Sequence, residues 1–289
     1  MLARTLYTAG NYGRALNLFD QLFAGEQAKN LSITNLRWIA STLPQCPDES
    51  LAKHAAELAL NVSERLEMAI RDPKLDDWFA PQRAAELKSD RAAAQTAVSR
   101  LEQRIHLDAG RAATKAGQYD KAVAELEKIE LLEADSPYFY DMRFALAEVR
   151  ELQGRADEAR AELAKISVRA NRTGDFALYD KAQVLTGESF LKSDAVNKAY
   201  ACFGIVAATA FPEDDEDGGS DAEQDPETEP EADEAARQWI EQAVYRTAYT
   251  AALLGRDDER DRMVAKYRKH FPGGKYADAI GSLPQSQAQ

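Results

Sequence analysis

The sequence predicts an all-α protein built as a solenoid of repeated helix–turn–helix units. A phrase that recurs along the chain is the main evidence. It is clearest in AGQYDKAVAELEKI, which begins at Ala116, and similar stretches begin at Ala9 and Gln153. In each copy the apolar residues are three to four positions apart, which places them on one face of a helix. Aromatic residues make up only 8% of the chain, which favours helices packed through small side chains.

Each copy of the phrase can be aligned on the residue expected at the turn between its two helices. These turn residues are Gly10, Gly117, Gly154, Asp194 and Gly255. Glycine suits such a turn because it adopts the left-handed backbone at little cost. Five residues after the turn come Ala15, Ala122, Ala159 and Ala199, with Arg260 as the exception. Seven residues before it come Ala3, Gly110, Ala147, Gly187 and Ala248. We expect these small residues where the two helices of a unit cross.

The spacing of the turns reveals an insertion. The turns at 117, 154 and 194 are 37 and 40 residues apart, but the next turn, at 255, follows after 61. The segment 213–235 accounts for the excess, and it contains 13 Asp or Glu residues and no Lys or Arg. The remaining acidic residues number 36, equal to the 36 basic ones, so the net charge of −13 resides in this segment. We predict a disordered acidic loop between repeats.

Three roles remain open for the acidic loop: solvation, masking of basic residues in a binding groove, or attraction of a basic partner. Part of it, from Glu213 to Asp221, resembles a calcium loop, but Gln224 stands where a bidentate Glu is needed. The neutral remainder lacks the clustered Lys and Arg that bind phosphates, so no nucleic-acid partner is expected. No apolar run is long enough for a membrane span, and the first residues do not form a signal peptide.

The repeats and their gaps define the expected organisation. Residues 1–24 form a truncated repeat, 25–102 a divergent helical region, 103–212 three repeats, 236–282 a last repeat and 283–289 a tail. In the divergent region one helix should end near Pro44, a second should be capped by Asp48 and stop at Pro73, and a single helix of about 30 residues should begin at about 82. Because the first repeat lacks the start of its first helix, Met1 is interpreted as lying inside a repeat of a longer protein or as a misassigned start.

These features resemble the tetratricopeptide repeat (TPR). In that family helix pairs of about 34 residues carry small residues at the crossing and an aromatic residue after the turn, here Tyr12 and Tyr119. The resemblance implies a right-handed solenoid with a concave groove. The stretch RMVAKYRKHFPGGKYADAI, from Arg262 to Ile280, is also similar to repeats of bacterial envelope proteins, namely outer-membrane-assembly lipoproteins and coordinators associated with the Tol system.

The resemblance implies a binding surface on the first helices of the repeats, which hold an extended or helical peptide in many members of the family. The implied groove residues are Arg104, Leu107, Arg111, Thr114, Asp141, Phe144, Glu148, Lys181, Val184, Glu188, Leu191, Gln242, Tyr245 and Tyr249. Among them Arg104 and Arg111 are the expected anchors for an acidic partner. We therefore predict a non-catalytic scaffold that binds a protein or peptide. The alternative is a structural spacer or self-association array of an envelope assembly, without a groove ligand.

No residue pattern for catalysis is recognised, so we expect neither enzymatic activity nor a cofactor or metal. The three histidines, His54, His106 and His270, are far apart in the sequence. The stretch around Lys275 lacks the glycine and hydroxyl residues of a phosphate loop. Cys46 and Cys202 are interpreted as free thiols. The compartment stays open between cytoplasm and, if a signal peptide lies upstream, the cell envelope.

Overall fold

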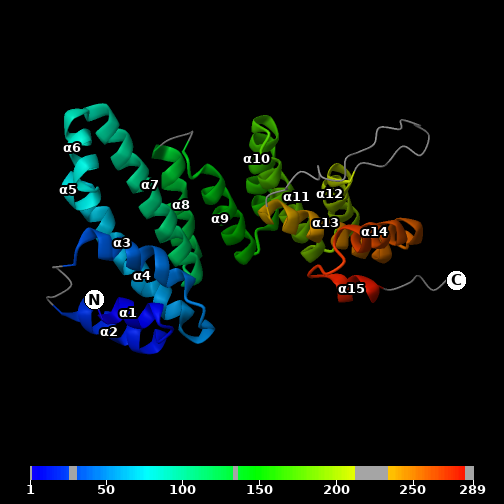
Figure 1. The fold of residues 1–289 in the computed structure, drawn as a ribbon, viewed down its shortest axis with the longest axis horizontal. Coiled ribbons are helices and arrows are strands. Elements are labelled where there is room, and N and C mark those ends of the chain that lie inside the picture. Colours follow the sequence, from blue (N-terminus) through cyan, green and yellow to red (C-terminus); the bar gives the residue numbers. More distant parts are fainter. Residues whose placement is uncertain (1, 26–30, 133–135, 212–233, 284–289) are drawn as a thin grey trace. The chain divides into compact units, whose positions relative to one another are not determined.

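The structure is a computed structural model, and it describes residues 2–25, 31–132, 136–211 and 234–283. Within these ranges it contains only helices and connecting turns, as the sequence predicts for an all-α protein (Figure 1). The acidic segment lies outside the described residues except for Glu234 and Ala235, which already belong to a helix. Its expected disorder is therefore not tested.

The chain divides into two compact units, residues 1–154 and 155–289. The first unit contains α1 (Leu2–Thr8), α2 (Tyr12–Ala24), α3 (Ile33–Thr42), a 3-10 turn η2 (Leu43–Gln45), α4 (Glu49–Ile70), α5 (Leu75–Trp78), α6 (Pro81–Ser89), α7 (Arg91–Lys115), α8 (Tyr119–Leu132) and α9 (Phe139–Leu152). The second contains α10 (Ala156–Thr173), α11 (Phe176–Lys192), α12 (Val196–Ala210), α13 (Glu234–Leu253), α14 (Asp257–His270) and α15 (Ala277–Gly281). The boundary falls at an expected repeat turn, so α9 and α10, which one repeat was expected to pair, belong to different units.

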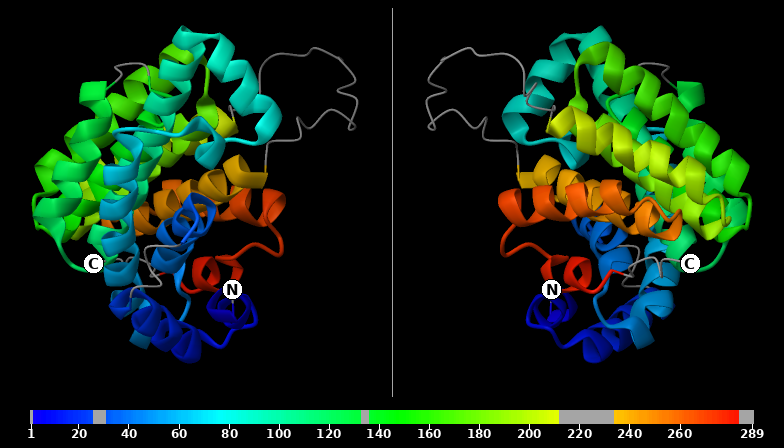
Figure 2. Two further views of the ribbon diagram at one scale, coloured as in Figure 1. Left: turned by 90° about the vertical axis from the view of Figure 1, so that its left-hand side faces the viewer. Right: turned by 90° about the vertical axis from the view of Figure 1, so that its right-hand side faces the viewer.

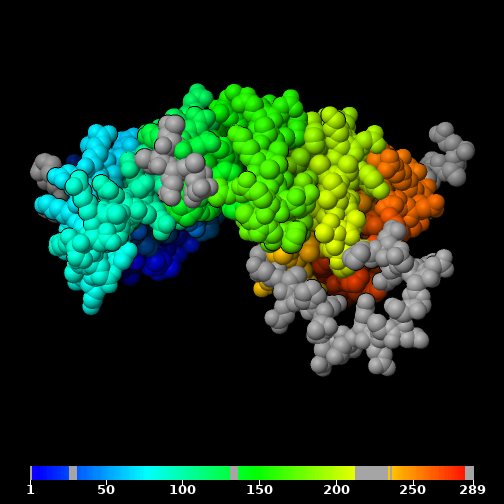
Figure 3. Space-filling model, turned by 90° about the horizontal axis from the view of Figure 1, so that it is seen from above, coloured from blue at the N-terminus to red at the C-terminus, as the bar shows by residue number. Residues whose placement is uncertain are grey.

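Helices within each unit pack mainly on their neighbours in the sequence. In the second unit α10 contacts α11, α11 contacts α12, α12 contacts α13 and α13 contacts α14. The views in Figure 2 show α13 and α14 side by side, and the surface in Figure 3 passes from green α10 through yellow α12 to orange α14. In addition α11 contacts α13, two helices further along the chain. Such sequential packing is compatible with a helical repeat.

The expected turns have the backbone that the sequence predicts. Gly10, Gly117, Gly154 and Gly255 all have a positive φ, and so does Asp194 at 57°, the only non-glycine residue with one in the described chain. At the α7–α8 turn the amide of Gly117 donates to the carbonyl of Thr114 and that of Gln118 to Ala113. The same pair of bonds recurs around Asp194. These bonds satisfy carbonyl groups at the end of each first helix and stop it there.

The helix crossings are also repeated in detail. A Cβ atom on Gly110 of α7 would lie 2.6 Å from Leu126 Cδ2 of α8, and one on Gly187 of α11 would lie 2.5 Å from Phe203 Cε1 of α12. Each glycine precedes its turn by seven residues, and each partner follows the turn by nine. The small residues of the second helices, Ala122, Ala159 and Ala199, are completely buried. The predicted crossings at Gly110 and Gly187 are confirmed.

The divergent region between the first two recognised repeats is helical, as predicted, with one difference. Helix α3 ends at Thr42, just before Pro44, and the Asp48 carboxylate caps α4 by accepting from the amide of Ser50. The expectation of one long helix from about 82 is wrong, because two helices, α6 and α7, meet at Asp90. The carboxylate of Asp90 accepts from the amide of Ala93 at 3.0 Å, and an aspartate that caps a new helix competes with continuation of the old one.

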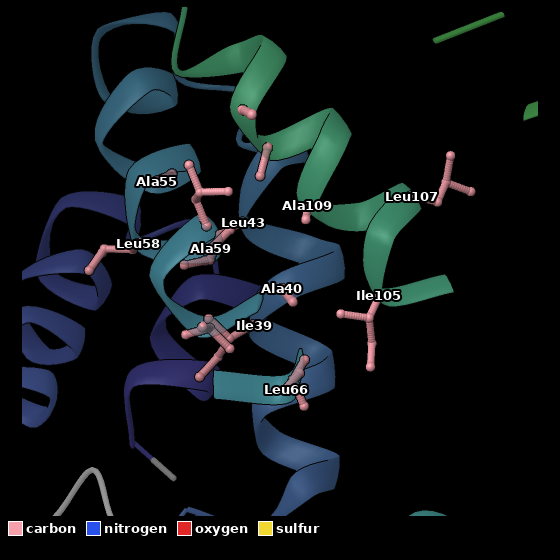
Figure 4. Packing of buried hydrophobic residues seen from close by; sticks show 14 of the residues in the cluster. Ile39, Ala40, Leu43, Ala55, Leu58, Ala59, Leu66, Ile105, Leu107 and Ala109 are labelled. Atoms are coloured by element: carbon pink, nitrogen blue, oxygen red, sulfur yellow. The ribbon is translucent and has the colours of Figure 1, made fainter. Parts of the chain in front are cut away.

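The core of the first unit is formed where α3, α4 and α7 meet. Figure 4 shows Ile39 and Ala40 of α3 facing Ala59 and Leu66 of α4, with Ile105 of α7 beside them. All five side chains are at most 7% exposed. The alanines keep the helices close, while the branched residues fill the space between them. This core holds α7 against α3, an arrangement on which the candidate site depends.

The close approach of α11 and α12 leads to the first testable prediction. Replacing Gly187 by Ala should lower the free energy of unfolding by about 1–3 kcal/mol, since the new methyl group must displace Phe203 in a packed core. The measurement is chemical or thermal unfolding followed by circular dichroism.

Gly204, on the second helix of the same pair, provides the matched control, because a Cβ atom there meets nothing within 4 Å. Gly204→Ala should leave stability unchanged or raise it by up to about 1 kcal/mol through better helix propensity. Equal effects of the two substitutions would contradict the assigned crossing.

Candidate functional site

Two adjoining cavities lie in the first unit between α3, α7 and α9. Their volumes are about 200 and 330 Å³, and they share Ala40, Ser41 and Asp108 in their walls. The smaller is also lined by Pro44, Gln45, Arg111, Thr114, Lys115, Ala145 and Glu148. The larger is also lined by Thr34, Arg37, Trp38, Leu66, Leu101, Arg104, Ile105 and Tyr138. Because they share a wall, we treat them as one groove, here called the α3–α7 groove.

The centre of the α3–α7 groove is a buried carboxylate, Asp108. Arg104 donates to it from Nε at 3.1 Å. Burial raises the pKa of Asp108, while the charges of Arg104, Arg111 and Arg37 act in the opposite direction. Arg37 makes no side-chain hydrogen bond or ion pair with any described residue. The groove therefore offers more guanidinium groups than its one buried carboxylate can satisfy.

Other charges of the groove are paired only at its rim. Arg111 donates to Asp141 at 2.6 Å, and Lys115 lies 3.9 Å from Glu148. All four of these side chains are between 42% and 56% exposed. Exposed ion pairs contribute little to stability, so a ligand could exchange with them at small cost.

The structure brings together some of the expected groove residues of the first unit and corrects others. Arg104, Arg111, Thr114 and Glu148 line the groove. Leu107 does not, because it is completely buried and leaves α7 in a different direction from Ile105 (Figure 4). Asp141 contributes through its ion pair with Arg111, and the half-buried Phe144 lines neither cavity.

Among the groove residues that were missed from the sequence are Arg37, Trp38 and Tyr138. The first two belong to α3, in the region that matches no repeat well, and Tyr138 lies just before α9. Arg37 and Ser41, another groove residue, are four positions apart and therefore lie on one face of α3. This spacing is the one local signal that could have indicated which face of α3 lines the groove. Without knowing that α3 lies beside α7, nothing in that spacing points to a site.

The expected groove residues of the second unit form a separate cluster on α11 and α13, together with Tyr276. Glu188 accepts from Arg246 through both carboxylate oxygens, at 2.6 and 2.9 Å, and from Gln242 at 2.9 Å. The ring of Tyr245 stacks on Tyr276 with centroids 4.5 Å apart, and Tyr249 lies 6.3 Å from Tyr245. The side chains of this cluster therefore form their hydrogen bonds and ring contacts with one another.

The other expected residues of α11 are half-buried or completely buried. The ammonium group of Lys181 lies over the ring of Trp239 at 5.7 Å, and Leu191 is half-buried. Val184 is completely buried between α11 and its neighbours, so the expectation that it faces a groove is wrong. The sequence register places the residues on the correct helices, but it does not separate lining from core.

A buried carboxylate, Asp180, precedes Lys181 on α11. It is 9% exposed and has no hydrogen-bond or ion-pair partner among the described residues. Burial raises its pKa to about 6. An unpaired carboxylate in such a place is destabilising when ionised.

One group of side chains in the described chain has the composition of a metal site. Glu67 of α4, His106 of α7 and Glu125 of α8 place one ligand atom each within 4.8 Å of the others. Both cysteines are free thiols, and burial raises the pKa of Cys202, which disfavours the thiolate form that binds metals. No motif connects His106 with residues 39 positions before it and 19 after it.

Comparison with known proteins identifies no relative. The sequence matches no protein-family model, and no curated protein matches it either. Among the described helices none combines the length and apolar character required to cross a bilayer.

Asp180 leads to a prediction about pH. The pKa of an aspartate in an unfolded chain is about 3.9, and the folded value is higher, so the folded protein binds this proton more tightly. The contribution of protonated Asp180 is therefore present at low pH and is lost as the pH rises from about 4 to above 6. Asp180→Asn should raise the free energy of unfolding at pH 7.5 by about 1–2 kcal/mol and have little effect at pH 4.

Unfolding of wild type and variant at both pH values tests this. Asp175→Asn is the matched control on the same helix, because the Asp175 carboxylate accepts from the amide of Leu178 and caps α11. That variant should change stability little at either pH, because Asn caps a helix about as well as Asp. A gain for Asp180→Asn that is the same at both pH values would rule out ionisation as its cause.

Proposed function

We propose that the protein is a non-catalytic interaction scaffold of the TPR type, whose α3–α7 groove binds an acidic segment of a partner protein. The observation that carries this proposal is the charge of the groove. Its walls hold four basic side chains, Arg37, Arg104, Arg111 and Lys115, against two acidic ones. The chain as a whole carries a net charge of −13, so this local excess of positive charge runs against the composition.

The repeat type is supported by the equivalence of separate helix pairs. The pairs α7–α8 and α11–α12 share a left-handed turn residue, a glycine seven residues before it and an apolar contact nine residues after it. These are also the positions at which the sequence resembles the family. A scaffold role follows from the way such proteins present the first helix of each pair to a ligand.

The groove also determines the chemistry of its ligand. A guanidinium group forms two parallel hydrogen bonds with a carboxylate, and Arg37 has its donors available among the described residues. The half-buried rings of Trp38 and Tyr138 offer apolar surface in the same cavity. A segment that alternates acidic and apolar residues satisfies both features. A nucleic acid does not, because the carboxylates of Asp108 and Glu148 lie among the basic side chains that its phosphates would contact.

The second candidate is a spacer that binds no ligand. The cluster on α11 and α13 favours it, since Glu188, Gln242 and Arg246 already satisfy one another. Polar groups paired in this way have little to gain from a partner. The second unit thus supports a structural role, while the α3–α7 groove supports binding.

Replacement of the groove arginines distinguishes the two candidates. A fluorescently labelled peptide of alternating aspartate and leucine should bind the full chain, and binding should weaken as salt increases. The double variant Arg37→Ala, Arg104→Ala should bind at least about tenfold more weakly, because each lost charge-assisted hydrogen bond is worth about 1.5–3 kcal/mol. Fluorescence anisotropy gives the affinities.

The double variant Arg91→Ala, Arg100→Ala is the control. Both residues are exposed on α7 and line neither cavity, so this variant changes the net charge equally without touching the groove. It should bind like wild type. Equal losses in both variants would indicate non-specific attraction, and no binding by wild type would favour the spacer.

A further inference from the structure

The cluster of Glu67, His106 and Glu125 is buried within the first unit and joins three helices. Their side chains are 21%, 6% and 10% exposed, respectively. The Nδ1 atom of His106 lies 2.9 Å from Glu125 Oε2 and 3.8 Å from Glu67 Oε1. None of the three lines the α3–α7 groove, so the cluster is separate from the proposed binding site.

The charges of the cluster balance only when one of its side chains takes up a proton or a cation binds to it. The one fixed positive charge is Lys128, whose Nζ lies 2.9 Å from Glu125 Oε1 and 3.5 Å from Glu67 Oε2. Two carboxylates and one ammonium group leave one negative charge when the imidazole is neutral. Buried net charge is costly, so the cluster favours either a proton on its side chains or a bound cation.

The two carboxylates divide this excess unequally. Although burial opposes it, hydrogen bonds from His106 and Lys128 hold the pKa of Glu125 down to about 2. Burial and the negative charge of Glu125 raise the pKa of Glu67. The surroundings therefore favour the ionised form of Glu125 and disfavour that of Glu67.

The donor atoms are spaced suitably for a metal ion. Zinc binds imidazole nitrogen and carboxylate oxygen at about 2.0–2.2 Å, which places two ligands of a tetrahedral ion about 3.4 Å apart. The distances from His106 Nδ1 to the two carboxylates, 2.9 and 3.8 Å, lie on either side of this value. Changes of about half an ångström would bring both of these distances to this value, and the two carboxylates lie within 4.8 Å of each other. Three separate helices, α4, α7 and α8, fix the donors in place.

We propose that Glu67, His106 and Glu125 form a binding site for one divalent transition-metal ion, and that zinc is the ion their nitrogen and oxygen donors suit best. Binding uses the Nδ1 lone pair, so the proton that Nδ1 donates to Glu125 is released to solvent or the ring carries its proton on Nε2 instead. Lys128, whose side chain is 40% exposed, turns outward as the ion replaces its charge. Water supplies the fourth ligand.

Titration of the metal-free full chain with zinc chloride tests the site. Isothermal calorimetry should show one ion bound per chain, and thermal unfolding should shift to higher temperature in proportion to zinc. His106→Gln should weaken zinc binding at least about tenfold, as loss of a ligand does. Glu67→Gln should act in the same direction and keeps the experiment conclusive if the histidine variant does not fold.

His54→Gln is the matched control. His54 belongs to the same unit and lies 3.1 Å from a single carboxylate, Asp20, but it is exposed. This variant should bind zinc like wild type. Cobalt(II) adds a readout that stability alone cannot imitate, since its visible absorption should appear with wild type and His54→Gln and be lost with His106→Gln. Absence of zinc binding in wild type, or binding that His106→Gln leaves unchanged, would show that the cluster is an ion-pair network only.

Discussion

The rest of the structure depends on close contact between paired helices. Such contact is possible because a glycine, which has no side chain, lies at the crossing. Gly110 admits Leu126 between α7 and α8, and Gly187 admits Phe203 between α11 and α12. A left-handed turn residue follows each glycine and returns the chain antiparallel to itself. Because α8 covers one side of α7 so closely, the other sides remain for α3, α4 and α9. The groove and the buried cluster both arise from this placement of a single helix.

Charge is distributed unevenly over the protein. The sequence outside residues 213–235 is neutral, yet the α3–α7 groove has an excess of basic side chains and the cluster around His106 has an excess of acidic ones. Several other ion pairs, such as that of Lys121 with Glu64, are between exposed side chains and contribute little. A local excess of basic or acidic side chains, rather than the net charge of the chain, therefore indicates where a ligand of opposite charge could bind. In the second unit, by contrast, Glu188 and Arg246 pair with each other and leave no excess charge.

Sequence reasoning identified what depends on local spacing and failed where distant elements meet. The turn at Gly117, the crossing at Gly187 and the cap at Asp48 follow from short-range rules, and all three are confirmed. The break at Asp90 was missed, although an aspartate before a helix is itself a local signal. Trp38 in the groove could not be recognised, because its role depends on α3 lying beside α7. Register also fails to distinguish a buried Leu107 from an exposed Arg111, since both fall on one stripe of the helix.

The two proposed sites use different residues of α7, and this makes their functions separable. Arg104 and Arg111 point into the groove with α3, whereas His106 meets α4 and α8. Lys128 provides the cluster with a resident positive charge. A metal there would tighten α4, α7 and α8 without entering the groove. Since α7 also holds the groove arginines, a stiffer α7 would lower the entropy lost when a peptide is bound. The ion would in that case act on binding through order alone, and it would change the affinity of the groove without changing which peptides it selects.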